Sequence, residues 1–385
     1  MRSTLAWVFF VALGVGCGSG IGGGGDSGTS ADASADAGET LDAGLAPDAG
    51  LDRDAGPAPD GGSLAPDASL ECALAQACDG PLPPFGATRD WRHTTTRLFT
   101  ILQGDARHRG RDLYLREGEP QWGLAKFTYG LADDDLKDEE VDVFLERDCG
   151  GAWESLGTVR TTDDGDHATV LGVEDTGGRV YLDLSSAGVT LPVGRHRLLY
   201  VVAGDHSTAT QIVEILPAGA RFVVTDVDGT QTESETAEWV SLLTGSGPAA
   251  QPSGAALLEA FARRGYHLLY LTARPDWLDP RTHQWLADNG YPPGIVHTTL
   301  TFTGALNAAA QTFKEEELAL LAASFPGGLY VAIGNTDSDI GAYATAGVPP
   351  ALSWSYQHDP GAIGTRVDDY GTRIAEVEAL PPLCR

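Results

Sequence analysis

The chain has 385 residues, and its 54 Asp and Glu outweigh its 25 Lys and Arg to give a formal net charge of −29. A nucleic-acid-binding protein needs clustered Lys and Arg to displace counterions, and the sequence has no such run, which excludes that class. A surface this acidic also repels anionic lipid unless a bound cation or a local basic site intervenes.

Residues 1–17 carry a positive Arg2 followed by an apolar run over residues 5–13. The run is too short to span a bilayer and therefore predicts an export signal. It ends in LGVGC at residues 13–17, which resembles a bacterial lipoprotein signal. The resemblance implies that Cys17 is lipidated and anchors the chain to a membrane of the bacterial cell envelope. An ordinary signal peptide, and hence a secreted protein, is the alternative.

Residues 18–70 contain nine Asp, one Glu and one Arg, and they repeat the triplet Asp-Ala-Gly. Without an aromatic residue they cannot bury enough apolar surface to offset the entropy lost on ordering. We interpret this segment as a disordered tether. A calcium-binding repeat is the alternative, disfavoured because the spacing lacks the regular turns of a calcium loop.

Four cysteines, Cys72, Cys78, Cys149 and Cys384, remain if Cys17 is lipidated. An even number in an exported chain predicts two disulfides, for which three pairings are possible. A zinc site is disfavoured because no Cys and His pair has the spacing of a structural zinc motif.

Residues 72–220 are predicted to form a β-sandwich domain of immunoglobulin-like type. Short apolar runs alternate with polar residues and are separated by turn-rich stretches, a pattern typical of antiparallel sheets with one solvated face. The predicted strands are 113–115, 124–129, 141–145, 180–184, 198–202 and 212–216.

Residues 221–385 change to continuous apolar strands that alternate with helices, as in a parallel sheet covered on both faces. We expect strands at 222–225, 268–271 and 329–333 and helices at 252–264, 281–289 and 313–325. The predicted fold class is therefore α/β, with a Rossmann-like catalytic domain preceded by the sandwich. In such sheets the chemistry lies just past the carboxyl ends of the strands.

Two carboxylates, Asp226 and Asp228, follow the first of these strands. An extended backbone points both the same way, so together they would bind a divalent cation or divide nucleophile and acid–base roles. Turn aspartates that bond the backbone are the alternative. Thr272, after the second strand, offers a hydroxyl either to a phosphate oxygen or to the strand end as a cap.

Lys314 lies on the third predicted helix beside Glu315, Glu316 and Glu317. It would neutralise a transferring phosphoryl group or, alternatively, act as a solvated ion-pair partner. Asn335 and Asp339 follow the last strand, where they would form an oxygen-rich metal site or an N-cap cluster.

Taken in order, these residues resemble the four motifs of the haloacid-dehalogenase superfamily of phosphotransferases and phosphatases. Within it the chain is most similar to the lipin-type and RdgB/Nir-type lipid-handling domains, over about residues 190–355. The similar stretches are DVDGTQTESE at 226–235, LTARP at 271–275, FKEEEL at 313–318 and GNTDSDIGAYATAGVP at 334–349. The implied fold of residues 221–385 is haloacid-dehalogenase-like.

The resemblance implies phosphatidate phosphatase chemistry. Asp226 would be the nucleophile that forms an aspartyl-phosphate, and Asp228 would protonate the leaving oxygen and then activate water. Thr272 and Lys314 would hold the phosphoryl oxygens. The remaining substrate contacts would come from Gly229, Thr230, Ala273 and Arg274.

The resemblance also implies a magnesium cofactor. Asp226, the Asp228 backbone carbonyl and Asn335 would ligate Mg²⁺, and Asp339 would support them. The nearby Asp337 has no role in this scheme.

RdgB/Nir-type domains lack the nucleophilic aspartate and are thought to sense phosphatidic acid, so a binding module with little turnover is one alternative. The chain keeps both Asp226 and Asp228, which favours turnover, because two carboxylates cost roughly several kcal/mol to desolvate without a cation. A phosphatase for soluble phosphate esters is a third interpretation. The expected partner is a phospholipid or a membrane surface, and the oligomeric state stays open.

Overall fold

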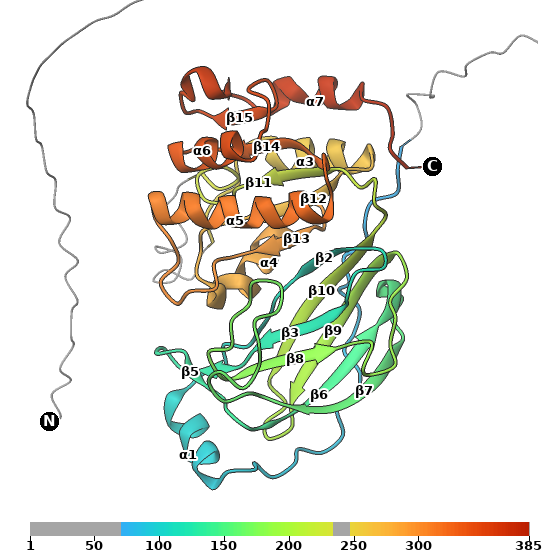
Figure 1. Cartoon of the computed structure of the whole chain (residues 1–385), viewed down its shortest axis with the longest axis vertical. Helices are drawn as coiled ribbons and strands as arrows, with labels where there is room; N and C mark the ends of the chain where they lie inside the picture. The colour runs from blue at the N-terminus through green and yellow to red at the C-terminus, as the bar shows by residue number, and fades with distance from the viewer. Residues whose placement is uncertain (1–70, 234–246, 385) are drawn as a thin grey trace, which may run out of the picture. The chain divides into compact units, whose positions relative to one another are not determined.

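The computed structural model describes residues 71–233 and 247–384, all within one compact unit, Ser63–Arg385 (Figure 1). The predicted signal peptide, the tether and Cys17 lie outside the described residues. Within the described part of the chain, no helix combines the length and apolarity needed to span a bilayer.

The amino-terminal part of the described chain is a β-sandwich built from a three-stranded and a five-stranded sheet. The first sheet has the order β1 (Arg109–Gly110), β3 (Trp122–Lys126), β8 (Arg179–Asp183). The second has the order β2 (Leu113–Arg116), β10 (Thr208–Leu216), β9 (Gly194–Val202), β6 (Glu140–Glu146), β7 (Trp153–Arg160). This confirms the predicted sandwich, with one difference: β2 pairs with β10 in parallel.

Alternation of side chains explains how the sandwich encloses its core. In β6, Val141, Val143 and Leu145 are completely buried, whereas the two residues between them, Asp142 and Phe144, are partly exposed. Phe127 and Tyr200 complete the same cluster. Four features were not predicted: the two-residue strand β1, the mostly exposed edge strand β7, the helix α1 (Thr94–Gln103) and the short strand β5 (Asp134–Asp135). The last of these pairs with β4 (Thr128–Tyr129), at the end of the predicted strand 124–129.

The carboxyl-terminal part is a six-stranded, fully parallel sheet. Its order is β13 (Ile295–His297), β12 (His267–Leu271), β11 (Phe222–Thr225), β14 (Leu329–Gly334), β15 (Ser353–Tyr356), β16 (Thr365–Val367). The prediction of a parallel sheet is confirmed, and the continuous apolar run of β11 is buried on both faces, as expected.

Helices cover both faces of this sheet (Figure 1). One face packs against α3 (Gly254–Arg263) and α7 (Gly371–Glu378), and the other against α5 (Ala308–Ser324) and α6 (Asp337–Thr345). The helix α4 (Asp279–Asp288) lies next to β13. Three short 3-10 turns complete the fold, η1 (Arg147–Cys149), η2 (Asp276–Leu278) and η3 (Gly361–Ile363).

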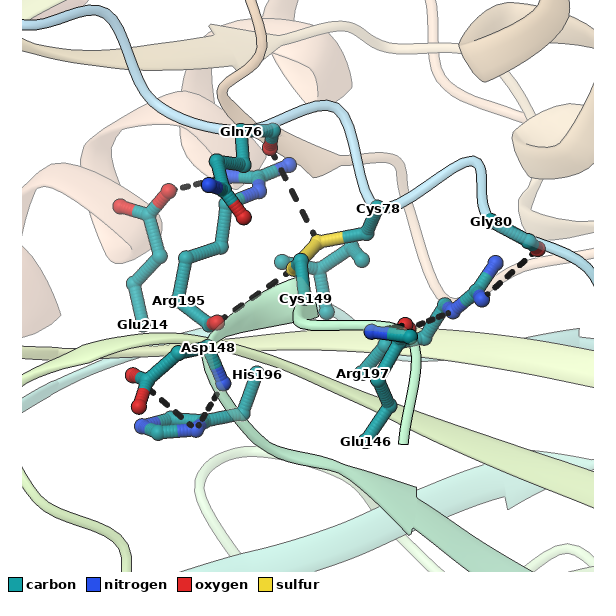
Figure 2. The surroundings of a disulfide bond; sticks show 12 residues. Gln76, Cys78, Gly80, Glu146, Asp148, Cys149, Arg195, His196, Arg197 and Glu214 are labelled. Carbon is teal, nitrogen blue, oxygen red and sulfur yellow. Dashed lines mark hydrogen bonds and ion pairs between the residues drawn. A yellow bond between two sulfur atoms is a disulfide. The ribbon is translucent and has the colours of Figure 1, made fainter. Parts of the chain in front are cut away.

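Two disulfides settle the pairing that the sequence leaves open: Cys72 with Cys384 and Cys78 with Cys149. The first joins the start of the described chain to its end. Figure 2 shows the second, which ties the segment before the sandwich to η1. Next to it, Arg197 binds Glu146 at 2.7 Å and donates to the Gly80 carbonyl at 3.0 Å, so the same segment is also held by a hydrogen bond from a buried, paired arginine.

Replacing both Cys72 and Cys384 with serine should lower the free energy of unfolding by about 2–4 kcal/mol, because the bridge constrains the unfolded chain. Urea unfolding of the oxidised proteins measures the difference. The Cys78→Ser/Cys149→Ser variant is the matched control, and its loss should be smaller because its bridge spans 71 residues instead of 312. Equal stability of the wild type and the first variant would contradict this account.

Arg109 of β1 and the two residues that link β1 to β2, Arg111 and Asp112, hold the sandwich against the parallel sheet. Arg109 binds Asp276 of η2 at 3.0 Å, and Arg111 binds Glu317 of α5 at 2.5 Å. Asp112 binds His283 of α4 at 3.1 Å. The first two contacts reach the loop after β12 and the helix that carries Lys314, and both of these elements also contribute to the site described below. The third contact reaches α4.

His283 makes the stability of this contact between the sandwich and the parallel sheet sensitive to pH. Although burial opposes its charge, the Asp112 and Asp279 carboxylates raise the pKa of His283 from near 6.5 to about 9. A group whose folded pKa is raised contributes stability below its unfolded pKa and loses it as the pH rises through the folded pKa. The stabilisation by charged His283 is therefore lost between the unfolded and folded pKa values, over about pH 6.5–9.

In wild-type protein, the urea midpoint should therefore fall between pH 6.5 and pH 9, and His283→Gln should reduce that fall. His93→Gln is the matched control, since His93 also faces a carboxylate, Asp138 at 2.9 Å, but lies at an exposed position. If the two variants have the same pH profile, His283 does not carry the effect.

Candidate active site

The site lies at the carboxyl edge of the parallel sheet, where three neighbouring strands end. Asp226 follows β11, Thr272 follows β12 and Asn335 follows β14. Because β11 lies between β12 and β14, these three residues meet at one place. Lys314 reaches the same place from α5.

Lys314 is the central cation of this site. Its Nζ donates to Asp226 Oδ1 at 2.6 Å and also to Asp339 Oδ1, and the side chain is almost fully buried. The interpretation of Lys314 as a solvated ion-pair partner is therefore wrong. Although burial opposes its charge, the two carboxylates raise the pKa of Lys314. The lysine stays charged at neutral pH and neutralises part of a buried acidic cluster.

Asp226, directly after β11, is buried at the cleft. Burial, reinforced by the Asp339 and Asp228 carboxylates and opposed by Lys314, raises the pKa of Asp226 to about 7. Its second oxygen, Oδ2, accepts a hydrogen bond from Thr230 Oγ1 at 3.0 Å. Any further positive charge near Asp226 would favour its ionised form.

Gly229 and Thr230, predicted to contact substrate, build the turn beneath Asp226 instead. Gly229 has a φ of +71°, a conformation that glycine adopts without strain, and its N–H donates to Thr232 Oγ1 at 2.9 Å. Thr230 is fully buried, and its hydroxyl lies 2.9 Å from Asn335 Oδ1. Both residues therefore position Asp226 and Asn335.

Asp228 turns away from Lys314 toward the loop after β12. Arg274 donates to both of its oxygens, at 2.8 Å from Nε and 2.6 Å from Nη2, and Thr272 donates at 3.1 Å. Thr272, predicted to hold a phosphate, and Arg274, predicted to contact substrate, thus hold the Asp228 carboxylate. Ala273 lies between them and lines the cleft.

Asp339 and Asp337 have different surroundings. Asp339 Oδ2 accepts hydrogen bonds from the backbone N–H groups of Asn335 and Thr336, and Thr336 completes a capping box at the start of α6. The predicted N-cap cluster is therefore present, and Asp339 within it also contacts Lys314. Asp337 is exposed and lies 2.9 Å from His358 Nε2.

This site has oxygen atoms that could bind a magnesium ion, but its acidic side chains do not converge on one point. In the described residues, no group of three or more His, Cys, Asp or Glu is arranged to hold a metal. Asp226 Oδ2 and Asn335 Oδ1 nevertheless converge on the single Thr230 hydroxyl, at 3.0 and 2.9 Å. Carboxylate and amide oxygens are the donors that Mg²⁺ prefers, so this pair fits such an ion. Asp228 and Asp339 direct their carboxylates elsewhere.

Most of these residues, among them Asp226, Lys314 and Asn335, line a cleft of about 750 Å³ that opens to solvent. Its lining includes Gln311 and His358, which the sequence analysis did not identify. His358 follows β15, a short strand with two serines that gives no apolar run, so no strand end was expected there. At the rim, Leu306 is 80% exposed.

Both parts of the chain match family models. Residues 223–355 match the LNS2 domain of PITM 1-3, and residues 106–215 match the β-sandwich domain of PITM 1-3. Human membrane-associated phosphatidylinositol transfer protein 2 is 30% identical over 269 residues, which cover 69% of this chain and 18% of that protein. Protein retinal degeneration B of Drosophila melanogaster is 28% identical over 207 residues, which cover 53% of this chain and 15% of that protein. The chain spans less than one-fifth of the length of these two relatives.

Among solved structures, the cobalt-bound deoxy-D-mannose-octulosonate 8-phosphate phosphatase from Haemophilus influenzae is 16% identical. It has a TM-score of 0.29, with 42% of this chain and 90% of that chain covered. A likeness this slight supports no inference.

The comparisons correct the sequence-based assignment. The chain was expected to carry a lipin-type or RdgB/Nir-type lipid-handling domain and a bacterial lipoprotein signal, anchored to a cell envelope through Cys17. The matching models are instead those of PITM 1-3, and the relatives are human and fly proteins, the human one described as membrane-associated. The lipoprotein, signal-peptide and bacterial-envelope assignments are therefore wrong.

Replacing Lys314 with methionine should destabilise the protein by about 3–5 kcal/mol, because it leaves Asp226 and Asp339 buried without their cation. Lys137→Met is the matched control: Lys137 binds Asp164 at 2.6 Å, but both side chains are exposed, so its loss should be about 1 kcal/mol or less. Urea unfolding measures both changes. Similar losses in the two variants would contradict the central role given to Lys314.

Proposed function

We propose that this chain hydrolyses a phosphomonoester, with phosphatidic acid as the substrate. The observation that carries the proposal is the state of Asp226: a buried carboxylate at the floor of an open cleft, with an ammonium on one oxygen and a hydroxyl on the other. Such surroundings hold a nucleophile in one orientation and offset the charge that a phosphate brings.

The reaction would proceed in two balanced steps. A carboxylate oxygen of Asp226 attacks phosphorus, the phosphorus–oxygen ester bond breaks, and Asp228 gives its proton to the departing diacylglycerol oxygen. Asp228 then takes a proton from water, whose oxygen attacks the aspartyl-phosphate and releases inorganic phosphate and free Asp226. Lys314 would offset negative charge throughout, since it already contacts Asp226.

Phosphate binding would release Asp228 for this role. Arg274 and Thr272 now donate to the Asp228 carboxylate, and Arg274 lines the cleft where a phosphate would enter. A dianionic phosphate competes well for a guanidinium, because it accepts paired hydrogen bonds. Exchange of Arg274 from Asp228 to the substrate would leave Asp228 free to accept and return a proton.

Asp226, the Asp228 backbone carbonyl and Asn335 would hold Mg²⁺. A bound Mg²⁺ supplies positive charge beside the phosphoryl oxygens. Within the chain itself, Thr230 keeps the Asp226 and Asn335 oxygens together, and Asp339 keeps Lys314 in reach of Asp226.

Two observations support a lipid substrate. Two human relatives are named membrane-associated phosphatidylinositol transfer proteins, a name that refers to a phospholipid. The cleft is also wide, and its rim carries the exposed Leu306, with Phe302 nearby in the same loop at 49% exposure. An apolar rim suits an amphiphilic substrate presented at a membrane surface.

Phosphate release from vesicles that contain phosphatidic acid tests this proposal. Release should require Mg²⁺ and should fall by about 10³-fold or more in Asp226→Asn, which removes the nucleophile. Asp368→Asn, at an exposed position paired with Arg366, is the matched control and should keep the wild-type rate. Full activity of Asp226→Asn would refute the covalent route. Turnover of soluble phosphate esters without turnover of lipid would refute phosphatidic acid as the substrate.

A phosphatidic-acid-binding module with little turnover is the second candidate. The Arg274–Asp228 pair favours it, because the pair occupies the proposed proton donor in the absence of ligand. Co-sedimentation with phosphatidic acid vesicles, measured beside phosphate release, separates the two. Binding without release would support this second candidate against the first.

A further inference from the structure

Loops beside the cleft carry apolar side chains that face solvent. Leu306, at the rim of the cleft, is 80% exposed, and Phe302, in the same loop, is 49% exposed. The β-sandwich contributes Leu131, which is 83% exposed in the turn between β4 and β5. Single exposed apolar residues are common on protein surfaces, whereas neighbouring ones mark a binding surface. The question is therefore whether these three residues are neighbours.

Trp277, a half-buried residue of η2, connects the loop after β13 to the sandwich. Its Nε1 donates to the Phe302 carbonyl at 2.8 Å, and the two rings lie 6.3 Å apart. On the sandwich side, the guanidinium carbon of Arg107 lies 4.5 Å from the centre of the Trp277 ring. The indole ring thus has one contact in each part of the chain.

Arg109 holds the turn that carries Leu131 against η2. It binds Asp133, two residues after Leu131, at 2.7 Å, and Asp276, directly before Trp277, at 3.0 Å. All three charged groups are buried, so these contacts fix the turn beside η2. Four side chains from the two parts of the chain therefore form one surface beside the cleft, called the docking surface below: Leu131, Trp277, Phe302 and Leu306.

The form and the charge of the docking surface fit a lipid bilayer. Its two most exposed side chains, Leu131 and Leu306, protrude from separate loops, and protruding apolar side chains can enter the acyl-chain region of a membrane. Trp277 and Arg107 suit the membrane interface, where aromatic rings and cations lie at headgroup level. A chain with a net charge of −29 is repelled by an anionic surface, so apolar contact has to supply the binding energy.

We infer that the docking surface inserts into a lipid bilayer by apolar contact, with the Leu131 turn of the sandwich as part of the inserted surface. Leu306 belongs both to the docking surface and to the lining of the cleft, so a lipid would pass directly from one to the other. A protein bound to the same surface would instead cover the mouth of the cleft. The inference rests on the proposed function for its substrate, but insertion into a bilayer without substrate is measured separately.

Sedimentation of the full chain with phosphatidylcholine vesicles tests the inference, because this lipid has no net charge and no phosphomonoester. The wild type should bind at least as tightly at about 1 M sodium chloride as at about 0.1 M, since salt screens charge and not apolar contact. Leu131→Gln should weaken binding by about tenfold or more, because it removes one inserted leucine. Leu320→Gln is the matched control: this leucine is 44% exposed near the end of α5, and its variant should bind as the wild type does.

Three results would overturn the inference: no binding of the wild type to phosphatidylcholine, binding lost at the higher salt concentration, or equal binding of the wild type and Leu131→Gln. A concentration-dependent dimer that Leu131→Gln abolishes, without vesicle binding, would assign the docking surface to a second copy of the chain and would also overturn it.

Phosphate release separates this inference from the proposed hydrolysis. Leu131→Gln should slow release from phosphatidic acid in phosphatidylcholine vesicles and leave release from dissolved short-chain phosphatidic acid unchanged. Equal rates of the variant and the wild type on vesicles would contradict the docking role of Leu131. If neither substrate releases phosphate, the hydrolysis is refuted, and vesicle binding still decides whether the docking surface inserts.

Discussion

The ammonium group of Lys314 is the contact on which the candidate site depends. It joins Asp226, at the end of β11, to Asp339, at the start of α6, in a place closed to solvent. Two carboxylates so close together would repel each other and would be costly to bury alone. One buried lysine offsets that cost and fixes where the carboxylates point, so the same interaction stabilises the fold and prepares Asp226.

The position of Lys314 depends in turn on the sandwich. Arg111 binds Glu317, which lies one helical turn beyond Lys314 on α5, and Glu317 also lies 2.5 Å from His297 at the end of β13. Although burial opposes ionisation, Arg111 and His297 lower the pKa of Glu317 to about 2. The carboxylate is therefore ionised at any physiological pH, and the sandwich holds α5 through a permanent charge pair.

Features that depend on the local pattern of apolar residues could be predicted from the sequence. Features that depend on which side chains pair with each other in the folded protein could not. The apolar runs of β11 and β12 were predicted because strands buried on both faces are apolar throughout. The strand β15, with serines at 353 and 355, has no such run. The pairing of Arg274 with Asp228 was also missed, because only the folded loop after β12 brings that guanidinium within 2.6 Å of the Asp228 carboxylate.

Trapping the phosphorylated enzyme tests the central claim most directly. Excess wild-type protein is mixed with phosphatidic acid labelled on its phosphate, and samples are quenched in acid over a time course. The account predicts label on the peptide that contains Asp226, appearing before free phosphate, and none in Asp226→Asn. Free phosphate released at the full rate with no labelled Asp226 at any time would contradict it.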